Sequence, residues 1–170
     1  KSDLLLHTID SRRSEGEVWV YDPTESVNTE RATWSPLATC HTWQGAQRTA
    51  SWLAGATRGS TGLSDAEFWN ETAAKLLKPL LYAAARSGGT IADVVRWVNL
   101  QEEKEVFEAL KGAEAEAIDA AKASFAREGR QKSSVYTTAE TVLAASEDPN
   151  VPTSGNCSAI WPRERLSARG

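Results

Sequence analysis

The sequence predicts a mainly α-helical protein, a helical bundle with a short strand-bearing segment ahead of it. Three observations predict this class. Apolar residues recur every three to four positions through most of the chain after residue 63. Ser64 and Thr90 each precede an acidic residue by three positions, a pattern typical of helix starts. The stretch 101–128 is rich in Ala, Glu and Lys, which favour helices.

The first part of the chain combines one helix with one strand. Residues 2–15 are expected to form a short helix that Gly16 ends. In the segment 17–21, β-branched valines alternate with aromatic residues, which predicts a strand that ends at Asp22 and Pro23. This strand is the only one that the sequence predicts.

A loop and a second helix follow. Residues 24–41 are loop-like, and 42–57 repeats apolar residues at helical spacing. The polar stretch after this helix contains several glycines, which predicts a domain boundary after residue 62. We therefore divide the chain into three parts: 1–62, the helical part 63–146, and a return segment 147–170.

The helical part is expected to open with one long helix over 64–86. Pro79 lies inside it, and a proline in a helix costs roughly 3 kcal/mol. Six large apolar side chains on the same stripe contribute about 1.5–3 kcal/mol each when buried. We therefore expect the helix to continue through Pro79 with a bend.

The remaining helices are shorter. A helix is expected to start at Thr90, and Gly112 should divide 101–128 into two helices, the second closed by Gly129. A last helix is expected over 134–146. Apolar stripes also predict that three tryptophans belong to the core: Trp43, Trp69 and Trp97.

Composition excludes several classes of protein. The chain has 170 residues and a net charge of −4, which argues against a surface that wraps nucleic acid throughout. Two cysteines exclude a disulfide scaffold. The apolar runs are too short to span a membrane, and no signal peptide is visible. The sequence contains no Met, so we expect a soluble piece of a larger protein.

Motifs for catalysis are missing from the sequence. The stretch 55–62 carries glycines but no lysine, so it does not match the phosphate-binding pattern GxxxxGK[ST]. The two histidines and two cysteines have spacings that fit no zinc site. We therefore expect residues 1–170 not to form an enzyme by themselves and to hold no cofactor or metal.

Charge placement suggests two candidate binding segments. The first is acidic: Glu102, Glu103, Glu105, Glu108, Glu114, Glu116 and Asp119. The second is basic: Lys122, Arg127, Arg130 and Lys132. Both segments are consistent with a solvated helical hairpin. The acidic segment is also consistent with a face that attracts a basic partner over a long range and in a salt-sensitive manner.

Several phrases in order carry a resemblance to one family. They are Lys1-Ser2-Asp3-Leu4, Gly16-x-Val18-x-Val20-x-Asp22-Pro23, Trp34-Ser35-Pro36-Leu37, Phe68-Trp69 with the apolar stripe that follows, and Thr90-x-x-Asp93-Val94-x-x-Trp97. Together they resemble the coupling proteins of type IV secretion systems, which are conjugative DNA-transfer ATPases, in their actinobacterial form. The resemblance covers nearly the whole chain.

The resemblance implies a place in a larger ATPase. Residues 1–62 would be part of a RecA-like nucleotide-binding domain, 63–146 its inserted all-alpha domain, and 147–170 the return to the nucleotide-binding domain. The nucleotide-binding loop would precede residue 1, so ATP and Mg²⁺ would belong to the parent protein. The parent would be a homohexamer at the cytoplasmic face of the bacterial inner membrane, and this fragment would not touch the membrane directly.

Two functions follow as expectations. The first is recognition of cargo, a relaxase or an effector protein with a basic signal, which the acidic segment would bind at the entrance of the translocating ATPase. The alternative is a DNA-contacting helical element in which Lys122, Arg127, Arg130 and Lys132 guide the transferred strand.

Overall fold

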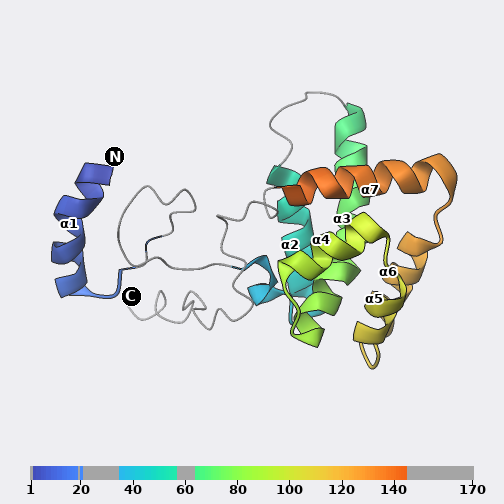
Figure 1. The fold of residues 1–170 in the computed structure, drawn as a ribbon, viewed down its shortest axis with the longest axis horizontal. Coiled ribbons are helices and arrows are strands. Elements are labelled where there is room, and N and C mark those ends of the chain that lie inside the picture. Colours follow the sequence, from blue (N-terminus) through green and yellow to red (C-terminus); the bar gives the residue numbers. More distant parts are fainter. Residues whose placement is uncertain (1, 19, 21–34, 57–63, 145–170) are drawn as a thin grey trace.

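The computed structural model describes residues 2–18, 20, 35–56 and 64–144, and the regular secondary structure in these ranges is helical (Figure 1). This confirms the prediction of a mainly α-helical protein. The elements are α1 (Ser2–Glu15), the 3₁₀ helix η1 (Pro36–Thr39), α2 (Trp43–Ala56), α3 (Ser64–Ser87), α4 (Ile91–Leu100), α5 (Lys104–Ala109), α6 (Ala115–Phe125) and α7 (Gly129–Leu143).

Helix α3 is the centre of the bundle. The helices α2, α4, α5, α6 and α7 all pack against it (Figure 1). A helix that is surrounded in this way must be apolar on nearly every side. The segment of α3 from Ala73 to Ala85 meets this requirement, and Leu76, Leu77 and Leu80 are completely buried.

The predicted long helix is confirmed, and it continues through Pro79. This proline is fully buried inside α3. Its ring removes one backbone hydrogen bond, which is unfavourable, but the large apolar side chains around it are removed from water when α3 is surrounded. The bend expected at Pro79 stays a prediction.

Local signals set most helix ends where the sequence predicts them. Helix α4 begins at a capping box, in which the backbone N–H and the hydroxyl of Thr90 both donate to Oδ2 of Asp93, at 2.8 and 3.0 Å. Gly112 lies between α5 and α6 with φ +71°, a conformation that favours glycine. The predicted division of 101–128 is therefore confirmed.

The role predicted for Gly129 is wrong. Helix α6 already ends at Phe125, and Gly129, with φ +58°, is the first residue of α7. Its left-handed backbone turns the chain out of the preceding segment, where Glu128 is extended. The last helix thus starts five residues earlier than the predicted start at Ser134, and α7 ends at Leu143.

The strand predicted over 17–21 is not found. Glu17, Val18 and Val20 have no regular secondary structure, while Trp19 and Tyr21 lie outside the described residues. Alternation favours a strand only when a neighbouring strand supplies hydrogen-bond partners. The described part of the chain contains no such strand, so the strand-bearing remnant of a RecA-like domain is unsupported.

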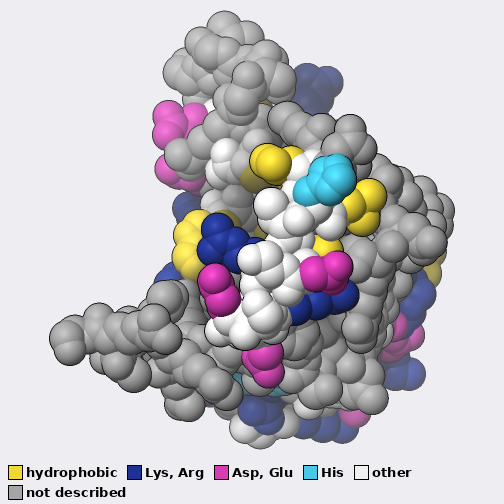
Figure 2. Space-filling model, turned by 90° about the vertical axis from the view of Figure 1, so that its left-hand side faces the viewer, with side chains coloured by type: hydrophobic (Ala, Val, Ile, Leu, Met, Phe, Trp, Pro, Cys, Tyr) yellow, Lys and Arg dark blue, Asp and Glu magenta, His cyan; other side chains and the backbone are white. Residues whose placement is uncertain are grey.

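Helix α1 lies apart from the bundle (Figure 1). Figure 2 views the molecule from that side, where basic, acidic and hydrophobic side chains of the described residues are interspersed. Two leucines of α1, Leu4 and Leu6, are exposed. Within the described ranges, each helix is too short or too polar to cross a lipid bilayer.

The segment before residue 62 shares its core with the helices after it. Leu37 of η1 and Trp43, Ala46 and Ala50 of α2 belong to the same cluster of buried side chains as α3. Helix α2 packs closely along α3. The predicted boundary at 62 stays a prediction, because residues 57–63 lie outside the described part of the chain.

A close approach of η1 to the start of α2 depends on one glycine. The backbone N–H of Gly45 donates to Oγ1 of Thr42 at 3.1 Å. A Cβ atom on Gly45 would lie 1.7 Å from the carbonyl oxygen of Thr39, which is far inside van der Waals contact. Only glycine fits there without moving the backbone.

We therefore predict that Gly45→Ala lowers the free energy of unfolding by about 1–3 kcal/mol, the usual cost of overpacking. Gly55→Ala in the same helix is the matched control, because a Cβ atom there meets nothing within 4 Å. That control should be neutral or stabilise the protein by up to about 1 kcal/mol. Urea unfolding of both variants measures the difference, and equal effects would contradict the prediction.

Candidate functional site

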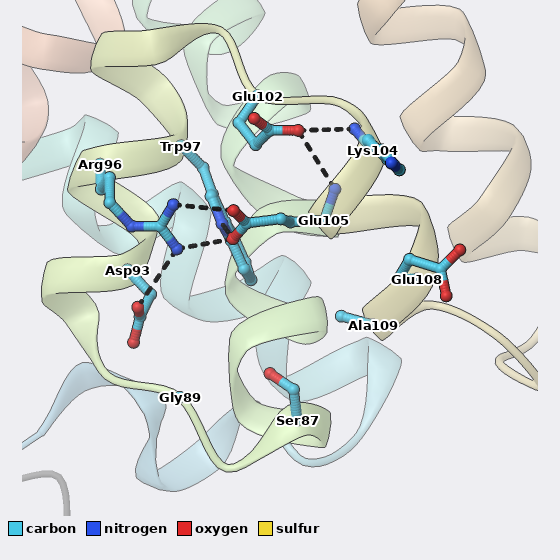
Figure 3. Close-up of a pocket in the computed structure, with 10 residues that line it drawn as sticks. All are labelled: Ser87, Gly89, Asp93, Arg96, Trp97, Glu102, Lys104, Glu105, Glu108 and Ala109. Atoms are coloured by element: carbon cyan, nitrogen blue, oxygen red, sulfur yellow. Dashed lines mark hydrogen bonds and ion pairs between the residues drawn. The ribbon is translucent and has the colours of Figure 1, made fainter.

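An open groove lies between α4 and α5 (Figure 3). Its volume is about 690 Å³, and it is lined by the end of α3, by α4 and by α5 with the link between them. Glu102, Glu105 and Glu108, three of the predicted acidic residues, line it together with Asp93. The structure therefore gathers part of the acidic segment into one concave surface.

Glu105 is the most strongly bound side chain in this groove. Arg96 donates to both of its carboxylate oxygens, from Nη1 at 3.1 Å and from Nη2 at 2.6 Å. The indole Nε1 of Trp97 donates to Oε2 at 2.9 Å. Arg96 also forms an ion pair with Asp93 at 3.5 Å (Figure 3). These bonds fix α5 to α4 and set the shape of the groove.

Hydrogen bonds also keep two carboxyl groups of the groove in their charged form. Hydrogen bonds from Arg96 and then Trp97 lower the pKa of Glu105 to about 2. The backbone N–H of Thr90 is the main reason that the pKa of Asp93 lies below its usual value. Both carboxyl groups are therefore ionised at neutral pH.

The two other acidic residues of the groove differ in their partners. Glu102 accepts hydrogen bonds from the backbone N–H groups of Lys104, at 2.9 Å, and Glu105, at 3.2 Å, so it holds the start of α5 (Figure 3). Glu108 pairs with Lys111 at 2.6 Å, and both side chains are more than half exposed. Exposed pairs contribute little stability, so Glu108 can change its partner at little cost.

The other four predicted acidic residues lie outside this groove. Glu103 pairs with Lys132 at 3.1 Å, and Asp119 pairs with Lys122 at 3.3 Å. The remaining two are Glu114, which accepts a hydrogen bond from the hydroxyl of Tyr82, and Glu116, which is exposed and has no ion pair among the described residues. The acidic segment is thus divided among several places and does not form one face.

The basic residues predicted to contact DNA lie near the junction of α6 and α7. Lys122 and Lys132 already hold carboxylates of this chain. Arg127 is half-buried, and Arg130 is exposed. Half of the predicted basic group is therefore neutralised within the protein.

No described residues form a cluster of three or more His, Cys, Asp and Glu that could hold a metal ion. Of the two cysteines, Cys40 is buried, and burial raises the pKa of its thiol. Cys157 lies outside the described part of the chain. The carboxylates that line the groove can attract a cationic group and accept hydrogen bonds from it.

Sequence reasoning missed Arg96 as a residue of the groove. Its partner Glu105 is nine residues away, across the end of a helix, where helical periodicity predicts no contact. Trp97 was correctly predicted to be buried, but its hydrogen bond to Glu105 was not predicted. A buried indole requires an acceptor, which is the signal that could have found this bond.

Comparison with known protein families gives a match over most of the chain. Residues 1–156 match the family model described as Type IV secretory system Conjugative DNA transfer. No curated protein and no solved structure matches the chain.

The depressed pKa of Glu105 predicts a pH dependence. A carboxyl whose folded pKa is about 2, against an ordinary value of 4.5, stabilises the fold fully above 4.5. This contribution is lost as the pH falls from 4.5 towards 2. The difference in unfolding free energy between the wild type and Glu105→Gln should therefore be constant near neutral pH and shrink in that acidic range. Urea titrations at several pH values measure it, and a difference that does not change with pH would contradict the assignment.

Proposed function

Since the chain belongs to the Type IV secretory system conjugative DNA transfer family, we propose that its helical bundle recognises cargo for the transfer machinery. The cargo is a relaxase or an effector protein that carries a basic signal. The observation that carries this proposal is the groove between α4 and α5, in which acidic side chains from both helices gather.

The charges of the groove favour a cationic partner. Four carboxylates line it, from Asp93, Glu102, Glu105 and Glu108, against the two cations of Arg96 and Lys104. Such an excess attracts basic segments over a distance and speeds their association. Salt screens this attraction, so the affinity should fall with ionic strength.

The parent protein supplies the rest of the machinery in this proposal. It is a coupling protein that hydrolyses ATP with Mg²⁺, assembles as a homohexamer, and is anchored at the cytoplasmic face of the bacterial inner membrane. Residues 1–170 carry no GxxxxGK[ST] pattern, so we assign them to docking and not to hydrolysis.

The contacts of the basic residues explain why cargo docking is favoured over the guiding of DNA. Lys122 and Lys132 would have to leave Asp119 and Glu103 before they could bind phosphates. Each such exchange reduces the gain from a phosphate contact. The Lys122–Asp119 pair is as exposed as the Glu108–Lys111 pair of the groove, so the difference rests on Lys132, whose side chain is only 25% exposed.

We predict that Glu108→Lys weakens binding of a fluorescein-labelled arginine-rich peptide by roughly tenfold at low salt. The new lysine puts a positive charge in the groove, and this charge repels the positively charged peptide. Asp119→Lys is the matched control. Both residues are exposed, both pair with a lysine three positions later, and only Glu108 lines the groove. Fluorescence anisotropy measures the two affinities.

Glu102 and Glu105 are unsuitable for this test, because they hold α5 in place. Equal weakening by Glu108→Lys and Asp119→Lys would show that only the net charge matters. In that case the groove would be rejected as the docking site. Loss of the difference at high salt is expected and supports an electrostatic contact.

A further inference from the structure

Helix α3 lacks one backbone hydrogen bond in its middle. In an α-helix each carbonyl accepts from the backbone N–H four positions later, and position 79 is a proline, which has no N–H. The carbonyl of Lys75 therefore loses its ordinary partner. This gap, which we call the Pro79 break, lies in a tightly packed part of α3, because Leu76, Leu77 and Pro79 are fully buried. A carbonyl without a partner is costly in such a place, so a donor from elsewhere is needed.

Helix α6, which packs against α3, supplies that donor. The hydroxyl of Ser124 donates to the carbonyl oxygen of Lys75 at 3.3 Å, across 49 positions of the sequence. A serine within a helix ordinarily bonds to a carbonyl one turn earlier in its own helix, as the hydroxyl of Ser51 does with Gln47. Ser124 bonds to a neighbouring helix instead, and it reaches the one carbonyl that Pro79 deprives of its ordinary partner.

The residue type at position 124 supports this role. The other buried residues of α6 are Ala117, Ala121 and Phe125, all apolar. Ser124 is itself only 4% exposed, so without an acceptor its hydroxyl would leave water uncompensated. An alanine would fit the same face and avoid that cost. The bond to Lys75 therefore satisfies two polar groups at once, the buried hydroxyl and the carbonyl at the break.

The same end of α6 also contacts α5 and α7. The ring of Phe125 packs edge-on against the ring of Phe107 in α5, with centroids 5.5 Å apart. The carbonyl oxygen of Phe125 accepts from Nζ of Lys132 in α7 at 3.4 Å, and Lys132 also pairs with Glu103, just before α5. A displacement of Ser124 therefore cannot stay within α6, because the next residue touches two other helices.

We propose that Ser124 is a conformational lock on the Pro79 break: its hydroxyl takes the place of the missing backbone N–H, keeps α3 continuous and fixes the end of α6 to it. Without this bond α3 would bend at the break, since helices kink where a proline interrupts their hydrogen bonds. The bend would move Phe125 relative to Phe107 and loosen α5. The lock belongs to the packing of the bundle, so it does not depend on cargo docking in the α4–α5 groove.

The first test is a double-mutant cycle on stability. Ser124→Ala should lower the ratio of folded to unfolded protein by roughly fivefold or more, because it leaves the Lys75 carbonyl without a donor. Pro79→Ala restores the backbone N–H, so the serine substitution should cost much less in that background. Urea unfolding of the wild type, the two single variants and the double variant measures both costs. Equal costs in the two backgrounds would overturn the proposal.

Thr72→Val is the matched control in α3. Thr72 is about as buried as Ser124, at 5% exposed, and its hydroxyl donates to the carbonyl oxygen of Phe68 at 2.7 Å. That carbonyl lies four positions earlier in the same helix, where the backbone N–H of Thr72 also serves it. Loss of this hydroxyl leaves no carbonyl without a donor. The control should therefore be close to neutral, with or without Pro79→Ala.

The second test is hydrogen exchange, which locates the effect and does not need Pro79→Ala to fold. In Ser124→Ala, backbone amides should exchange roughly fivefold faster or more in two places, the turns of α3 beside Pro79 and helix α5. Thr72→Val should show neither change. A uniform increase over all helices would indicate only a general loss of stability. That result, or unchanged exchange in α5, would overturn the lock.

Discussion

The burial of α3 on nearly all sides is the constraint on which the rest of the structure depends. A helix with leucines and alanines around most of its circumference is unstable in water, and the surrounding helices remove those side chains from it. None of the surrounding helices needs a wide apolar stripe, because each one covers a different part of α3. The short helices α4 and α5 are therefore held in place by α3, and the acidic groove between them is a product of that packing.

Polar contacts then decide which charges remain available to a partner. Glu105 is committed to Arg96 and Trp97, and Glu102 holds the backbone of α5. Glu108 has only an exposed lysine as its partner. A run of like charges in the sequence thus separates into residues that build the groove and residues that a partner can reach. Only the second kind can report on binding without disturbing the fold.

The helices could be predicted from the sequence because each depends on local signals. The capping residues Thr90 and Asp93, the break at Gly112 and the apolar stripe of α3 act over a few residues. The prediction of a strand over 17–21 failed because a strand depends on hydrogen bonds to a second strand, which can be distant in the sequence. Gly129 was misplaced because a glycine in the left-handed conformation can lie on either side of a helix end. The contact of Arg96 with Glu105 needed the angle between two helices, which no spacing reveals.

The packing of α2 along α3 has a mechanical consequence. Leu37 and Trp43 are embedded in the same core as the leucines of α3, and Gly45 brings the backbone of η1 into direct contact with α2. A pull on the chain ahead of Pro36 therefore cannot shift η1 and α2 alone. Moving them separately would expose buried apolar side chains such as Leu37 and Trp43 to water, which is unfavourable. Force applied at that end would reach α3 through the packed side chains of η1 and α2.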